Sequence, residues 1–179
     1  MYNQTTMFKK QNFSDVIKYL FVLFLAFWSF SILQKSEPYI LHSVNLIFHE
    51  AGHMILMPFF GDFITALGGT LMQLAIPLMF FVYFLREKNL FASLVMSWWV
   101  GDNLIDVSIY ISDAQARILP LLGGGDGHDW AYLLGELNIL KYDTLIGSLV
   151  YFLGAFIMFS SLVFALLVIR KIVGVENKY

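Results

Sequence analysis

Apolar residues occur along this chain in long runs that brief polar clusters separate. Five of these runs have roughly the 20 residues that a helix needs to cross the hydrocarbon core of a bilayer. The expected helices cover residues 16–33, 40–60, 67–85, 90–111 and 144–172. A sixth apolar stretch, 130–140, is too short to cross alone and is expected to be re-entrant, interfacial or a short span backed by protein. The pattern predicts an all-α polytopic membrane helix bundle of five or six transmembrane segments, in one integral membrane domain over residues 1–179.

Basic residues at the two ends of the chain bear on the number of crossings. Lys9 and Lys10 precede the first apolar run, and Arg170 and Lys171 end the last one. Basic flanks favour the cytoplasmic side, so two cytoplasmic ends require an even number of spans. Six spans satisfy this rule, whereas five would leave one basic end outside, but the connector that carries Arg86 and Lys88 fits poorly in the six-span scheme.

Composition narrows the class of protein and the kind of site. Hydrophobic residues make up 59% of the chain and charged residues 13%, with a mean hydropathy of +0.71. A net charge of −2 without a strongly basic segment excludes a nucleic-acid partner. With no cysteine, any metal ligand must come from His, Asp or Glu.

The second apolar run carries the main candidate for chemistry, the segment His49-Glu50-Ala51-Gly52-His53. Two imidazoles four residues apart project from one helix face toward a single ion. Glu50 lies about 100° around the helix, suited to act as general base on a water at an open coordination position of zinc rather than as a ligand. Three ionisable residues in an apolar segment are costly and are retained for function, although polar residues can also join helices. We therefore predict one zinc ion bound by His49 and His53.

A catalytic zinc needs a third protein ligand from elsewhere in the chain. We favour His128, because the adjacent Asp129 carboxylate can orient its imidazole. Asp129 itself is the next candidate, followed by Asp106. Alternatively, Asp126 and Asp129 have the spacing of a helix N-cap and an acidic first turn.

Polar residues on the neighbouring expected helices complete the candidate site. Asp102, Asp106 and Asp113 recur on one face of the fourth segment, which must therefore look inward. Asn103, Asp106 and Asp129 are the residues expected to face substrate.

The remaining polar and small residues near the motif are expected to have lesser roles. On the helix of the motif, Asn45 is expected to face the bundle interior, and His42 is expected near the interface, too far to share the ion. Gly68 and Gly69 are expected to pack a third helix against the metal helix. Thr70 and Gln73 are candidates for hydrogen bonds to a peptide backbone.

On its HExxH motif in a hydrophobic helix and a later acidic motif, the chain resembles the site-2 protease family of intramembrane zinc metalloproteases, and most of all its small bacterial members. The resemblance covers residues 41–134, with the second motif at 123–130. It implies that His49 and His53 are zinc ligands, that Glu50 is the catalytic base, and that a later aspartate completes the site. The family's Asn-Pro-x-x-Asp-Gly pattern is absent. The segment 103–106 matches it in part, and the segment 128–130 is an alternative candidate for the second motif.

These observations predict a zinc metallopeptidase that hydrolyses a peptide bond of a membrane-embedded protein or peptide substrate. The resemblance implies a multi-pass protein of the cytoplasmic membrane of a bacterium. Two other functions are compatible with the residues. One is a membrane zinc amidohydrolase that acts on a lipid amide, and the other is a non-catalytic metal-binding scaffold or transporter.

Overall fold

The computed structural model describes residues 13–34, 40–121 and 127–176, and this described part is helical without a strand. The glycine-rich segment expected to contribute to the site lies largely outside it, since residues 122–126 are not described. The elements are α1 (Phe13–Leu33), α2 (Ile40–Leu56), α3 (Asp62–Arg86), α4 (Leu90–Ser112), α5 (Asp129–Glu136), the short 3₁₀ helix η2 (Leu140–Tyr142) and α6 (Asp143–Glu176).

The observed helices follow the apolar runs of the sequence closely. The second ends at Leu56, earlier than expected, where Met57 begins a turn that contains Pro58. The third begins earlier than expected, at Asp62 after its N-cap Gly61. The short sixth run forms α5, a helix of only 8 residues.

Three of the described helical segments are long and apolar enough to cross a membrane. They are Phe13–Leu33, Asp62–Arg86 and Leu140–Arg170. These segments indicate a membrane protein. The other two long helices, α2 and α4, contain ionisable residues, and α2 has only 17 residues. The total of five or six spans therefore stays a prediction.

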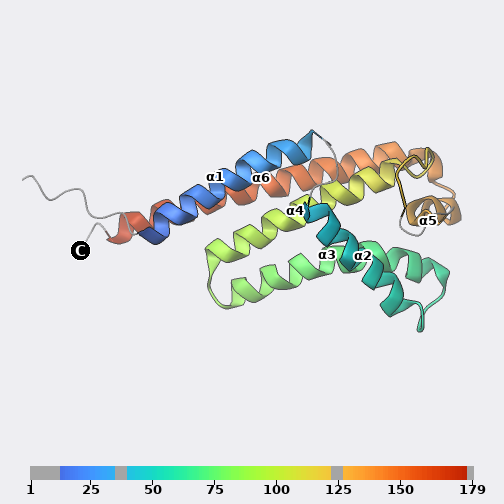
Figure 1. The fold of residues 1–179 in the computed structure, drawn as a ribbon, viewed down its shortest axis with the longest axis horizontal. Coiled ribbons are helices and arrows are strands. Elements are labelled where there is room, and N and C mark those ends of the chain that lie inside the picture. The colour runs from blue at the N-terminus through green and yellow to red at the C-terminus, as the bar shows by residue number, and fades with distance from the viewer. Residues whose placement is uncertain (1–12, 35–39, 122–126, 177–179) are drawn as a thin grey trace, which may run out of the picture.

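One half of the molecule is an elongated bundle in which α1 lies alongside α6 and α4 packs against both (Figure 1). Two glycines bring the α4 and α6 backbones into direct contact. A Cβ on Gly101 or on Gly154 would lie 2.7 Å from the carbonyl oxygen of the other. Between the three helices lies an apolar core, formed by Val22, Leu25, Ile32, Trp98, Ile105, Met158, Leu162, Ala165 and Ile169.

The other half is built by α2, α3 and α5 against the opposite side of α4. In Figure 1, α2 crosses α3 away from the α1–α6 pair, and α5 lies near the far end of α4. A Cβ on Gly52 would collide with the carbonyl of Gly68, and a Cβ on Gly68 would lie 3.1 Å from the Gly52 carbonyl oxygen. The packing role expected for Gly68 is therefore confirmed, and α3 itself fills the space beside Gly52.

Candidate metal centre

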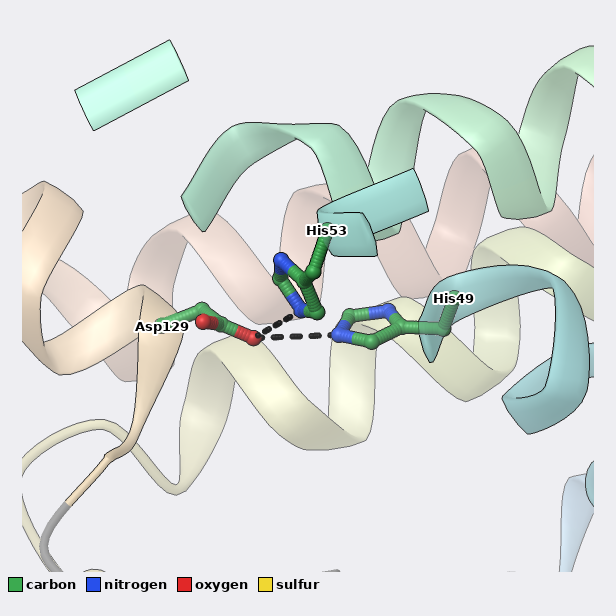
Figure 2. Close-up of side chains that lie close together, drawn as sticks. All are labelled: His49, His53 and Asp129. Carbon is green, nitrogen blue, oxygen red and sulfur yellow. Dashed lines mark hydrogen bonds and ion pairs between the residues drawn. The ribbon is translucent and has the colours of Figure 1, made fainter. Parts of the chain in front are cut away.

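Three side chains from two distant parts of the chain meet between α2, α3 and α5 (Figure 2). His49 and His53 project from one face of α2, and Asp129 is the first residue of α5. The Oδ2 atom of Asp129 lies 3.0 Å from Nε2 of His49 and 3.1 Å from Nε2 of His53. One ligand atom from each residue thus falls within 4.8 Å of the other two.

Two of the three separations between these atoms are close to those found around a single zinc ion. Ligand atoms bound at about 2.0–2.1 Å in a tetrahedron are roughly 3.3 Å apart, close to the two distances above. Two imidazoles and one carboxylate are a donor set that zinc accepts, and three protein ligands leave one coordination position open. The group therefore fits the zinc that the sequence predicts.

Each histidine is oriented by an acceptor on its other ring nitrogen. Nδ1 of His49 lies 3.1 Å from Oε1 of Gln73, and Nδ1 of His53 lies 2.8 Å from the backbone carbonyl oxygen of Thr65. Oxygen atoms of amides and carbonyls only accept, so Nδ1 carries the proton in both rings. In the neutral imidazoles, both Nε2 lone pairs then point into the candidate site, as metal binding requires.

Glu50 lies beside this group and does not belong to it. Its half-buried carboxylate is close enough to interact electrostatically with His53 and Tyr110. Among the described residues, it forms neither a hydrogen bond nor an ion pair. A carboxylate next to the metal group with free oxygen atoms is able to accept a proton.

Asp129 is held in place by the residue before it and by a tyrosine of α4. His128 is the N-cap of α5, and its Nδ1 accepts a hydrogen bond from the backbone nitrogen of Ala131 at 3.2 Å. The hydroxyl of Tyr110 donates to Oδ2 of Asp129 at 3.2 Å and accepts from the backbone nitrogen of Asp129 at 3.0 Å. The carboxylate is thereby fixed at the start of the helix.

The environment of Asp129 keeps its carboxylate charged. Burial alone would raise its pKa, but hydrogen bonds from His49 and His53 in their charged forms, in which both ring nitrogens donate, outweigh burial and lower the pKa of Asp129 to about 2. A carboxylate that is ionised over the whole physiological range is ready to bind a cation without losing a proton first.

His128, the favoured third ligand, is not part of this group. Its ring is buried and stacks on Tyr110 with centroids 4.2 Å apart. Because Nδ1 caps α5, the proton lies on Nε2, which faces the Asp113 carboxylate at 3.5 Å. Burial lowers the pKa of His128, consistent with the neutral ring that the cap needs. The residue that the structure brings to the two histidines is the alternative, Asp129.

The inward-facing residues of α4 also have defined partners. Asp102 is fully buried and accepts a hydrogen bond from Asn45 at 3.0 Å, which confirms the inward orientation expected for both. Asp106 accepts from Gln73 at 2.8 Å, outside the metal group. Asn103 is fully buried, and its amide donates to the Trp99 carbonyl one turn earlier.

Gly69 lies directly against the metal group. A Cβ on Gly69 would lie 2.5 Å from Nε2 of His49 and 2.6 Å from Nε2 of His53. Only a glycine leaves the space between the two imidazoles and α3 open. Gly69 therefore packs α3 directly against the imidazoles of His49 and His53.

Sequence reasoning missed the contributions of Tyr110, Gln73 and Thr65. Thr65 acts through its backbone, which carries no sequence signal. Gln73 and Thr70 were candidates for hydrogen bonds to a peptide backbone. In the structure, Gln73 bonds to His49 and Asp106, and Thr70 accepts from Trp130 of α5 at 3.2 Å. Tyr110 lies four residues after Asp106, on the inward face of α4, and that spacing was the available signal.

Comparison of the chain with protein-family models, with curated proteins and with solved structures gave no match in any of the three.

Proposed function

We propose that this protein is a multi-pass membrane zinc metallopeptidase in which His49, His53 and Asp129 bind one zinc ion and Glu50 is the general base. The observation that carries the proposal is the orientation of the two histidines. Both Nδ1 atoms donate to fixed oxygen acceptors, so both Nε2 atoms face one carboxylate oxygen. Helix packing alone does not require this convergence.

Glu50 supplies the proton transfers of peptide hydrolysis in this proposal. A bound zinc would act as a Lewis acid toward the scissile carbonyl. Glu50 takes a proton from the attacking water and passes it to the departing amine. Its position one residue after His49 puts it beside the ligand pair and keeps it off the ion.

The substrate class follows from the surroundings of the site. Helices that carry the ligands or pack against them are predominantly apolar, and α3 is long enough to cross a bilayer. We propose that the substrate is a membrane-embedded protein or peptide, locally unwound because a helix shields its own backbone groups. The resemblance to small bacterial site-2 proteases favours the cytoplasmic membrane of a bacterium as the location.

The test uses purified protein in liposomes with single-span model peptides that contain a Gly-Pro break at mid-membrane. Zinc content is measured on the same samples, and products are identified by mass spectrometry. We expect about one zinc per chain and cleavage of the peptides. Glu50→Gln should retain zinc and lower the cleavage rate on the order of 10²–10⁴-fold, because the amide cannot accept the proton.

A matched control is Glu87→Gln, which makes the same change at the end of α3, outside the site. Cleavage by Glu87→Gln should equal that of the unmodified protein. Equal cleavage by Glu50→Gln would reject Glu50 as the base, and loss of zinc from that variant would make Glu50 a ligand. If lipid amides in the liposomes are hydrolysed while the peptides stay intact, the site belongs to a lipid amidohydrolase.

A further inference from the structure

Gln73 of α3 is buried beside the metal group, and both ends of its side-chain amide are bonded. Its Oε1 atom faces Nδ1 of His49 at 3.1 Å, and its Nε2 atom donates to Oδ2 of Asp106 at 2.8 Å. Only 4% of the residue is exposed. Its amide therefore joins a helix that carries two ligands to the acidic face of α4.

The chain of hydrogen bonds continues past Asp106. The other carboxylate oxygen, Oδ1, lies 2.6 Å from Nδ1 of His42, which belongs to the first turn of α2. The side chain of His42 is 35% exposed and that of Asp106 is 12% exposed. Hydrogen bonds thus run from the partly exposed His42 through Asp106 and Gln73 to His49, over three helices.

The chemistry of Asp106 determines the direction of these bonds. An ionised carboxylate only accepts, so the NH₂ group of Gln73 must face Asp106 and its oxygen must face His49. The amide oxygen in turn only accepts, so the Nδ1 atom of His49 must carry the proton. Asp106 thereby determines, through one intervening amide, which ring nitrogen of His49 is available to a metal.

We propose that Gln73 is a positioning residue for the zinc ligand His49, and that Asp106, paired with His42, fixes the orientation of the Gln73 amide. This inference rests on the proposed zinc site. Residues that hold a ligating histidine in one tautomer commonly change metal affinity by about 10–100-fold when they are lost. The same change should therefore follow from breaking this chain.

Another buried side-chain amide, that of Asn45 on α2, provides a matched control. Asn45 donates to Asp102 at 3.0 Å and accepts from the Trp99 indole at 2.9 Å. It is fully buried and joins α2 to α4, as Gln73 joins α3 to both. Its hydrogen bonds do not reach His49 or His53. If Gln73 only joined helices, replacing Gln73 and replacing Asn45 should have the same effect on zinc affinity.

The first experiment compares Gln73→Met with Asn45→Leu in detergent, by competition for zinc with a chromogenic chelator. Circular dichroism melting reports stability on the same samples. We expect Gln73→Met to weaken zinc binding about 10–100-fold. Asn45→Leu should lower the melting temperature and leave zinc affinity unchanged.

The second experiment restores the pattern of donors and acceptors by a paired exchange. Gln73→Glu alone places a second carboxylate against Asp106, where the two repel each other in a poorly solvated site. Adding Asp106→Asn supplies an NH₂ donor to the introduced carboxylate, which still accepts from Nδ1 of His49. Zinc affinity of the double variant should exceed that of Gln73→Glu by about tenfold or more.

The outcomes separate this inference from the proposed function. Unmodified protein that fails to bind zinc would overturn the proposed function. If the unmodified protein binds zinc, equal affinity in Gln73→Met would overturn the role of Gln73, as would an equal loss in Asn45→Leu. If Gln73→Met does not fold, the paired exchange decides, and a double variant no better than Gln73→Glu would overturn the inference.

Discussion

Around α1, α4 and α6 the interior is apolar, and its few polar side chains bond to their own helix or to one neighbour. Ser29 donates to the Leu25 carbonyl at 2.7 Å and accepts from the Trp98 indole at 2.8 Å. Ser161 bonds to the Ile157 carbonyl and to Ser97. These two groups are uncharged, and their hydrogen bonds compensate their burial. The buried carboxylates of this half, Asp15 and Asp143, lie in the first turns of α1 and α6, where they pair with Lys18 and Gln115.

Around α2, α3 and α5 the interior contains ionisable side chains whose partners lie on other helices. His49 and His53 of α2 face Asp129 of α5, and His42 of α2 faces Asp106 of α4. Buried ionisable groups are expensive in an apolar protein and are retained where they have a function. The possible metal group thus lies in the half with buried ionisable groups on several helices, and the first half is mainly packed apolar surface.

Helix α4 belongs to both halves and explains how they work together. One face packs on α6 at Gly101, and the opposite face presents Asp106 to Gln73 and Tyr110 to Asp129. The apolar half thereby provides a rigid support for two residues that orient ligands. Substitutions around α2, α3 and α5 should consequently weaken zinc binding, whereas substitutions around α1, α4 and α6 should lower stability.

The largest expected effect comes from removing the third ligand. Asp129→Ala should abolish stoichiometric zinc, as His53→Ala should, because two remaining ligands seldom hold the ion against water. His128→Ala should instead remove the N-cap of α5 and lower stability by about 0.5–2 kcal/mol. Metal analysis and thermal unfolding of both variants check this order, and loss of zinc from His128→Ala alone would restore His128 as the ligand.

Gly69→Ala should have the next largest effect. Its methyl group would lie 2.5–2.6 Å from both ligating nitrogen atoms, so the imidazoles or α3 must move. We expect zinc affinity to fall by at least the roughly 10–100-fold of a lost outer-shell partner. Gly61→Ala is the control, since a Cβ there meets nothing within 4 Å. Equal affinity in the two variants, measured by chelator competition, would contradict the proposed position of the ion.

The sequence was sufficient to predict the helices and part of the site. The apolar runs predicted the helices because burial in lipid and protein requires long stretches of apolar residues. The spacing of His49 and His53 predicted their convergence because one helical turn separates them. Both predictions depend only on local periodicity, which a single sequence records.

What the sequence could not establish depends on contacts between distant segments. His128 and Asp129 are adjacent, and either could have pointed at the histidines. The choice follows from the Nδ1 atom of His128 capping α5 and from Tyr110 bonding to Asp129. Similarly, the bond between Gln73 and His49 requires α3 to pack closely on α2, which a pattern of hydrophobic residues does not specify.

In the apolar half, Gly154→Ala should lower stability and leave zinc binding intact. The added Cβ would lie 2.7 Å from the Gly101 carbonyl oxygen, so α4 and α6 must separate, at a cost of about 1–3 kcal/mol. Gly135→Ala in α5 is the matched control, because a Cβ there meets nothing within 4 Å. Unfolding in mixed micelles gives the stability, and the folded fraction should bind about one zinc. Loss of zinc from folded Gly154→Ala would show that the two halves are not independent.

Ser161→Ala should have the smallest effect. Ser161 is buried, and its hydroxyl oxygen lies 2.9 Å from that of Ser97 across the α4–α6 interface while its proton is donated to the Ile157 carbonyl of its own helix. Hydrogen bonds between helices in membranes contribute about 0.6 kcal/mol on average, because the unfolded helices find other partners. A double-mutant cycle with Ser97→Ala isolates this contribution from the bond within α6. Ser148→Ala, which loses only a bond within α6, is the control. A coupling energy well above about 1.7 kcal/mol, the upper end for such bonds, would mean that hydrogen bonds also determine the fold of the apolar half, and the contrast between the two halves would no longer hold.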